Sequence, residues 1–268
     1  MLIDSHCHLD DRVFDHDRKE VIEKAQTAGI QAIIIPAVAT YNFATVRDIA
    51  HQFEGGFYAL GVHPMWVHSS NFEDLDVLSQ SVEAAISDPR FVGIGEIGLD
   101  FFIKQIAVGE QREKQEHFYN EQLKLARRFD LPVILHVRRS QDMILKYLRR
   151  YDDLRGIAHA FNGSQQQADQ FIERGYLLGI GGAVTFERAQ QIRRHAQNYD
   201  LKHYALETDS PDIAPSWLAS HSARNTPAQI RGIAEVFAEL RGESFSEIEK
   251  QTGENVLNTF PRMKDLIN

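Results

Sequence analysis

The feature that most constrains this fold is a regular alternation of short apolar runs with amphipathic stretches along the whole chain. The runs are rich in β-branched residues, and several are apolar nearly throughout, as is typical of strands buried on both faces of a parallel sheet. They cover residues 2–4, 32–38, 57–62, 91–97, 132–137, 156–161, 176–184 and 204–207. Strands in this number with helical connections predict an α/β fold, a (β/α)8 TIM barrel.

The amphipathic stretches predict the helices of this barrel. Asp17 and Ser164 stand where helix N-caps are expected, and Gly29 and Gly175 where helices should end. Two more helices are predicted after the last strand, so the barrel should carry extra C-terminal helices. No linker-like segment interrupts the pattern, and residues 1–268 are therefore predicted to form a single domain. The predicted helices cover residues 21–28, 75–86, 111–129 and 168–174, then about 227–241 and 246–260.

Composition and charge exclude several classes of protein. The net charge of −9 argues against a protein that coats nucleic acid, because Lys and Arg contacts to phosphates dominate such binding. An enzyme that grips only a few phosphates remains compatible with it. The sequence has no apolar run of the roughly 20 residues that a membrane span needs, and no signal-peptide pattern. With a single cysteine, which fits a reducing compartment, we expect a cytoplasmic protein without membrane contact. No obligate protein partner is evident, and nothing forbids a monomer.

Two histidines close the first predicted strand, in Asp4-Ser5-His6-Cys7-His8. Because side chains alternate faces along a strand, His6 and His8 should point the same way, roughly 6–7 Å apart. Two imidazoles at that spacing can bind one metal ion. The alternative interpretation is a strand that happens to end in two polar residues. Cys7 should face the other way and pack behind the strand.

Other side chains of metal-binding types also stand at predicted strand ends. In this fold the C-terminal ends of the strands meet on one face, which carries the active site. The clustering therefore predicts a metal site at that face. The other seven histidines, among them His221, are scattered along the chain and are interpreted as surface or packing residues. The residues at strand ends are His6, His8, His63, Glu96, His136, His159 and Asp209.

With these segments in place, the sequence resembles the TatD family of metal-dependent hydrolases, within the amidohydrolase-like superfamily. The resemblance covers essentially the whole chain and rests on several ordered segments. For the best-known members it implies Mg-dependent deoxyribonuclease activity that works from 3′ ends. Among the segments are Gly61-Val62-His63-Pro64, Gly95-Glu96-Ile97-Gly98-Leu99-Asp100 and Glu207-Thr208-Asp209-Ser210-Pro211.

The resemblance also implies a centre with two divalent metal cations. His6, His8 and Asp209 would hold one cation, and Glu96 would bridge it to the other. The second cation would be held by His136 and His159. Imidazole ligands favour Zn or similar ions, whereas Mg prefers oxygen donors, so Zn, Mn and Mg all remain open.

Further roles follow from the family pattern. Asp209 and Glu96 are predicted to be catalytic, with Asp209 as ligand and proton shuttle. Three residues are candidates for substrate binding: His63, which would not hold metal, Arg138, which can grip a phosphate, and Arg224. Each Arg has the alternative of an ordinary loop cation, and the segment around Arg224 departs from the family pattern. Trp66 is interpreted either as a surface on which a base stacks or as a lid.

The expected function is a metal-dependent hydrolase of ester bonds. The first interpretation is a phosphodiesterase or deoxyribonuclease that uses metal-activated hydroxide, similar to a 3′-end exonuclease, with nucleic-acid ends as substrate. Hydroxide can attack carbon as well as phosphorus, so an ester or amide hydrolase such as a D-aminoacyl-tRNA deacylase is the alternative. A non-catalytic protein stabilised by metal is the third interpretation. Structural metal sites are usually closed by protein ligands, which argues against it.

Overall fold

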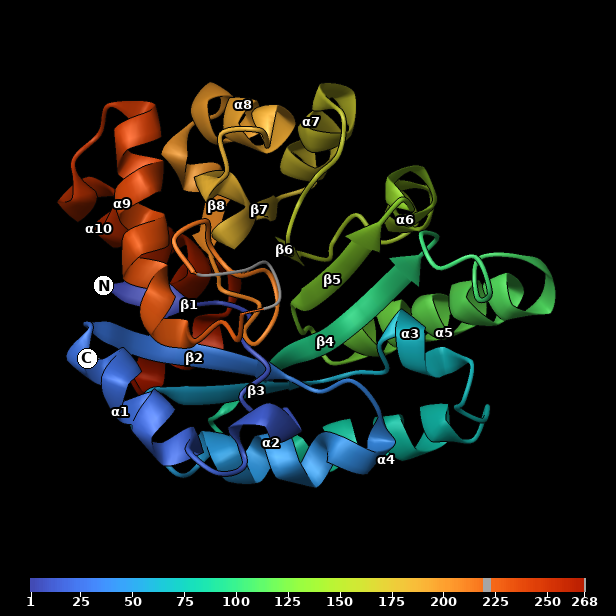
Figure 1. The fold of residues 1–268 in the computed structure, drawn as a ribbon. Coiled ribbons are helices and arrows are strands. Elements are labelled where there is room, and N and C mark those ends of the chain that lie inside the picture. The colour runs from blue at the N-terminus through green and yellow to red at the C-terminus, as the bar shows by residue number, and fades with distance from the viewer. Residues whose placement is uncertain (219–222, 268) are drawn as a thin grey trace.

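Eight parallel strands, hydrogen-bonded in the order of the sequence, form the centre of the molecule (Figure 1). The computed structural model describes residues 1–218 and 223–267. The N–H of Ser5 donates to the carbonyl of Leu206 at 3.0 Å and so links the last strand back to the first. This confirms the predicted (β/α)8 barrel. The strands are β1 (Leu2–Asp4), β2 (Ile30–Pro36), β3 (Gly56–Leu60), β4 (Phe91–Asp100), β5 (Val133–Arg138), β6 (Gly156–Ala158), β7 (Tyr176–Ile180) and β8 (Tyr204–Leu206).

Helices surround the strands, and two more follow β8, as predicted. Ser164 caps its helix, because its Oγ accepts from the N–H of Gln167 at 3.2 Å. Asp17 stands at the N-cap position of α1 but makes no side-chain bond to that helix. The helices on the outside are α1 (Arg18–Thr27), α2 (Phe43–Ala50), α3 (Pro64–Val67), α4 (Asp74–Ala85), α5 (Gly109–Arg128), α6 (Gln141–Leu148), α7 (Gln165–Glu173) and α8 (Gln190–Asn198), and the C-terminal pair is α9 (Ile230–Arg241) and α10 (Phe245–Thr259).

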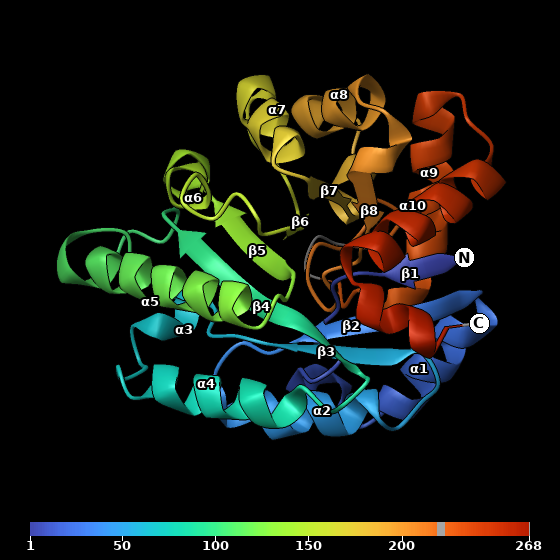
Figure 2. The same ribbon diagram turned by 180° about the vertical axis from the view of Figure 1, so that it is seen from behind.

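Alternation along the strands divides their side chains between two cores, one against the helices and one inside the barrel. The C-terminal segment closes one end of the inner core. Phe260 and Met263 pack into it, and Arg262 Nε donates to the carbonyl of Phe91, the first residue of β4, at 2.6 Å. Figure 2 shows α10 beside the start of β1. The N-terminal end of the barrel is therefore covered, and the opposite end is left for a site.

The end of β7 differs from the prediction. Residues 181–184 were expected to continue the strand, but Gly182–Thr185 form a 3₁₀ turn. The backbone of the loop after β8 lies against Gly182, where an added Cβ would collide with the carbonyl oxygen of Ile213. The chain therefore turns to follow that loop.

His221, which the sequence analysis interprets as a surface or packing residue, lies outside the described residues.

Within the described ranges, the helices lack the combination of length and apolar character that crossing a membrane requires.

Two glutamines of α5 hold the backbone of strand ends. Gln122 accepts from the N–H of Val62 at 2.7 Å and donates to the Val62 carbonyl at 3.1 Å. Gln115 accepts from the N–H of Asp100 at 2.9 Å. Both glutamines are 1% exposed. They are two helical turns apart and so share one face of α5. They fix the segments that carry His63 and Asp100.

Gln122→Leu is expected to lower the free energy of unfolding by roughly 2–4 kcal/mol. The substitution leaves the buried N–H and carbonyl of Val62 without partners, and an unsatisfied buried group costs about 1–3 kcal/mol. Denaturant unfolding of the metal-free protein measures the change. Gln80→Leu on the exposed face of α4 is the matched control, with an expected change within about 0.5 kcal/mol. Equal unfolding midpoints for wild type and Gln122→Leu would contradict this role of Gln122.

Candidate active site

All the side chains predicted to bind metal meet at the open end of the barrel. The N–H of Asp209 donates to the carbonyl of His6 at 2.9 Å, which joins the loops after β8 and β1. The parallel barrel thus gathers groups that are far apart in sequence, as the strand-end pattern predicted. His6 and His8 follow β1, Glu96 lies in β4, His136 in β5, His159 follows β6 and Asp209 follows β8.

The carboxylate of Glu96 lies at the centre of this cluster and is 1% exposed. Its Oε2 is 3.1 Å from His6 Nε2 and 3.3 Å from His8 Nε2. Its Oε1 is 2.9 Å from His136 Nδ1 and 3.2 Å from His159 Nε2. Burial raises the pKa of Glu96, but the surrounding imidazoles outweigh burial and hold that pKa well below its usual value. Glu96 is therefore an anion with each oxygen turned to a different set of imidazoles.

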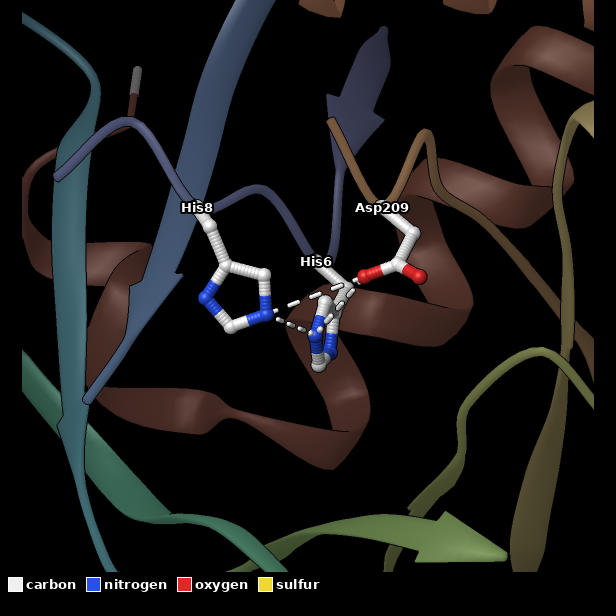
Figure 3. A group of neighbouring side chains, drawn as sticks. All are labelled: His6, His8 and Asp209. Atoms are coloured by element: carbon white, nitrogen blue, oxygen red, sulfur yellow. Dashed lines mark hydrogen bonds and ion pairs between the residues drawn. The ribbon is translucent and has the colours of Figure 1, made fainter. Parts of the chain in front are cut away.

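His6, His8 and Asp209 form one compact group (Figure 3). His6 Nε2 lies 3.1 Å from His8 Nε2 and 3.4 Å from Asp209 Oδ1. Burial is the main cause that lowers the pKa of His6 well below its usual value, so the ring is neutral. Burial also raises the pKa of Asp209 to about 6.

The chemistry of these donors fits a divalent cation. Two imidazole nitrogens at 3.1 Å cannot both present lone pairs to each other without a proton or a cation between them. Two groups of three residues each place their donor atoms within 4.8 Å of one another. One group is His6, His8 and Asp209, and the other is His6, Glu96 and His159. Imidazole and carboxylate together suit Zn, Mn or Fe better than Mg.

Carboxylates lie behind two of the histidines, close to the outer ring nitrogen of each. Asp100 Oδ2 is 3.1 Å from His136 Nε2, and its Oδ1 accepts from the N–H of Phe102 at 2.8 Å. Glu207 Oε1 lies 3.5 Å from His159 Nδ1. A carboxylate that accepts the outer N–H leaves the lone pair of the other nitrogen facing the centre. The positions of Asp100 and Glu207 suit them to orient the rings of His136 and His159.

His63 is held as a hydrogen-bond donor to the cluster. Its Nδ1 accepts from the N–H of Met65 at 3.1 Å, so the neutral ring carries its proton on Nε2. That nitrogen is 3.1 Å from Glu96 Oε1 and 3.0 Å from His136 Nδ1. Burial lowers the pKa of His63 to about 4, so the ring is neutral. By distance alone His63, Glu96 and His136 could bind a cation, but this tautomer makes His63 a donor.

The cluster opens into a cavity of about 1690 Å³. Arg138 lines its wall with the guanidinium carbon 3.9 Å from the ring centre of Phe102. Arg139 is exposed and also lines the cavity. On another part of the rim Trp66 is 40% exposed and meets Tyr41 edge to face, with ring centres 5.3 Å apart. The mouth thus offers cations and aromatic rings to a substrate.

Arg224 is engaged elsewhere. Its two terminal nitrogens lie 2.8 and 2.6 Å from the carboxylate oxygens of Asp17, and one also donates to the Val13 carbonyl at 3.0 Å. In the part of the chain that the structure describes, Arg224 does not line the cavity. This pairing fastens the loop after β8 to the start of α1. A substrate-binding role for Arg224 would require the pair to open, and it stays a prediction.

One acidic residue beside the candidate ligands was not predicted from the sequence: Asp10, which lines the cavity. Its carboxylate is held by Asn42 and approaches His8. A signal was available, because Asp10 continues the alternate spacing of Asp4, His6 and His8.

Comparison with known proteins gives consistent matches over nearly the full chain. A family model described as TatD related DNase matches residues 3–261. An Escherichia coli K12 protein named uncharacterized metal-dependent hydrolase YjjV is 38% identical over 96% of this chain and 97% of its own length. The human protein named deoxyribonuclease TATDN3 is 32% identical over 99% of this chain and 97% of its own. The crystal structure of YjjV superposes with a TM-score of 0.89 at 36% identity and covers 97% of this chain and 98% of that one.

Proposed function

The chain belongs to the family of TatD-related DNases, and from this premise we propose that it is a metal-dependent phosphodiesterase that cleaves nucleic acid at 3′ ends. Two divalent cations, Zn, Mn or Mg, are its proposed cofactors. The name of the human relative, a deoxyribonuclease at 32% identity, supports the substrate class.

The observation that carries the proposal is the position of Glu96. Its Oε2 faces His6 and His8, and its Oε1 faces His136 and His159, at 2.9 to 3.3 Å. A carboxylate with its two oxygens in two donor sets is suited to bridge two cations. In this assignment Asp209 completes the set of His6 and His8, as its Oδ1 lies 3.4 Å from His6 Nε2.

The residues around this centre have separate tasks. Bound cations supply a polarised water and neutralise charge that develops on the scissile group. Asp209, at the cavity wall, accepts a proton from the attacking water and returns it to the leaving oxygen. The Nε2–H of His63 faces Glu96 and His136 in the metal-free structure, and it would turn to a substrate oxygen once cations engage those two residues. Arg138 binds a phosphate with its guanidinium fork.

The test is a substrate screen of the metal-stripped protein with Mg, Mn or Zn added back. The substrates are single-stranded DNA and RNA labelled at either end, a generic phosphodiester and an aminoacyl-tRNA. We expect metal-dependent release of nucleotides from 3′ ends and protection by a blocked 3′ hydroxyl. Absence of phosphodiester cleavage with every metal would refute the proposal.

One feature of the cavity favours a second candidate, an aminoacyl ester hydrolase. The residues that line the cavity include Asp10, Asp11 and Asp15 after β1, with Arg12 among them, and Arg138 and Arg139 at the end of β5. A mouth with both signs of charge suits a substrate that carries an ammonium group as well as a phosphate. Cleavage of D-aminoacyl-tRNA in the same screen, faster than cleavage of any phosphodiester, would select this candidate.

Arg138→Ala is expected to lower kcat/KM for a phosphodiester by about 10–100-fold, mainly through KM. A hydrogen bond to a charged group contributes roughly 1.5–3 kcal/mol, and each 1.36 kcal/mol is about tenfold. The control Arg127→Ala removes an exposed Arg of α5 that pairs with Asp153 at 2.8 Å. The effect should disappear with an uncharged ester. An equal loss with both kinds of substrate would exclude phosphate binding by Arg138.

A further inference from the structure

Asp10 has one carboxylate oxygen without a partner, although its side chain is only 10% exposed. Its Oδ2 accepts from Asn42 Nδ2 at 2.7 Å. Its Oδ1 is buried and has no hydrogen-bond partner among the described residues. The nearest ring nitrogen to this oxygen in the cluster is His8 Nδ1, at 3.9 Å. A buried carboxylate oxygen is costly when it is left without a donor, so the free Oδ1 requires an explanation.

Asn42 fixes the direction of this carboxylate. Its Oδ1 accepts from the backbone N–H groups of Val38 at 3.1 Å and Ala39 at 3.2 Å, so its amide can present only Nδ2 to Asp10. Asn42 is itself 3% exposed. Asp10 Oδ2 is therefore held by a rigid donor, and Asp10 Oδ1 remains on the side of His8.

His8 is the histidine of the cluster that most needs such a restraint. Its side chain is 17% exposed, against 13% for His136, 6% for His159 and 0% for His6. Two of these rings already have a carboxylate at the outer nitrogen: Asp100 at 3.1 Å from His136 and Glu207 at 3.5 Å from His159. Asp10 stands in the same relation to His8, behind the nitrogen that faces away from Glu96.

We propose that Asp10 is a positioning residue for His8: it accepts the Nδ1–H and keeps the lone pair of Nε2 turned to Glu96 and Asp209. The proposal rests on the proposed function, since it gives His8 the role of a metal ligand. The present 3.9 Å closes to a hydrogen bond when the His8 ring moves by roughly 1 Å. Histidine ligands commonly donate their other N–H to a carboxylate, which fixes the tautomer and the ring orientation.

Asp10→Asn gives a sharp test because it reverses the chemistry at almost constant size. Asn42 Nδ2 would still donate to the side-chain oxygen at position 10. The NH₂ group of the introduced amide would then face His8 Nδ1. The His8 proton would then move to Nε2, which removes the lone pair from the centre. We expect Zn²⁺ and Mn²⁺ affinity, measured by competition with a chelating dye, to fall about 10–100-fold, as for loss of other groups that orient ligands.

The matched control is Asp15→Asn, which removes the same charge from another residue that lines the cavity. Asp15 is 53% exposed and pairs with Arg18, not with a histidine. We expect its metal affinity to stay within about twofold of wild type. Equal losses in both variants would overturn the proposal, because general attraction of cations by negative charge would then explain them.

Histidine NMR of the metal-free proteins provides a second readout that a merely structural role would not move. Burial lowers the pKa of His8, but the hydrogen bond and the charge of Glu96 outweigh burial and raise that pKa to about 9, so the spectra are recorded above this pKa, where the ring carries one proton. We then expect that proton on Nδ1 in wild type and on Nε2 in Asp10→Asn. Wild-type affinity in Asp10→Asn, or the same His8 tautomer in both proteins, would overturn the role of Asp10 and leave the proposed function intact. If wild type itself bound neither Zn²⁺ nor Mn²⁺, the proposed function would fail instead.

Discussion

Glu96→Ala is expected to abolish tight metal binding and to lower kcat/KM by on the order of 10⁴-fold. Within residues 1–218 and 223–267, Glu96 is the one carboxylate whose two oxygens reach both sets of imidazoles, at 2.9 to 3.3 Å. Its removal takes a negative charge from the centre of four histidines, so the affinity for both cations should fall together. Metal assistance supplies several kcal/mol of transition-state stabilisation, and each 1.36 kcal/mol is about tenfold in rate.

Metal content and rate must be measured on the same samples to interpret this loss. His63→Ala is the comparison, because His63 also contacts Glu96, at 3.1 Å, but carries its proton on the nitrogen that faces the cluster. It should keep its metal and lose only about 10²-fold, the usual range for one donor to developing charge. Equal losses in the two variants, with metal retained in both, would mean that the bridging role is misassigned.

The sequence predicted the barrel well because its strands are marked by buried, β-branched runs such as residues 132–137, where Val133, Ile134 and Leu135 are fully buried. Helix α8 carried no comparable signal. It is rich in Gln and Arg, and only His195 and Ala196 are buried in it, so no apolar stripe marks it. The predicted end of β7 was wrong for a different reason. The loop after β8 packs on Gly182, and such a contact depends on the tertiary path of the chain.

The cluster of candidate ligands could be predicted because a parallel barrel puts all strand C-termini at one end. Strand-end residues such as His6, Glu96 and His136 therefore meet whatever their separation in sequence. Hydrogen bonds made after folding could not be predicted. Which nitrogen of His63 carries the proton depends on the Met65 N–H. Arg224 has its nearest anion in Asp17, a contact that depends on the path of a loop.

Asp209→Asn is expected to keep at least part of the bound metal and to lose roughly 10²–10⁴-fold in kcat, the range of general acid–base catalysis. The substitution retains a side-chain oxygen near His6, where Asp209 Oδ1 now lies at 3.4 Å, but the amide cannot accept and return a proton. Asp209 lies at the wall of the cavity with its side chain 15% exposed, so it can reach both the cluster and a substrate.

Two measurements separate the roles of ligand and proton shuttle in Asp209. Metal content, determined first, gives the fraction of the variant that is loaded, and the rate is then expressed per loaded molecule. A phosphodiester with a very acidic leaving group needs little protonation of its leaving oxygen, so its rate should fall less than that of a nucleotide substrate with a poor leaving group. A shuttle therefore predicts a loss that grows with the pKa of the leaving group. If the loss per loaded molecule were small and the same for both substrates, Asp209 would act as a ligand only, and the proton would have to leave through another group or through water.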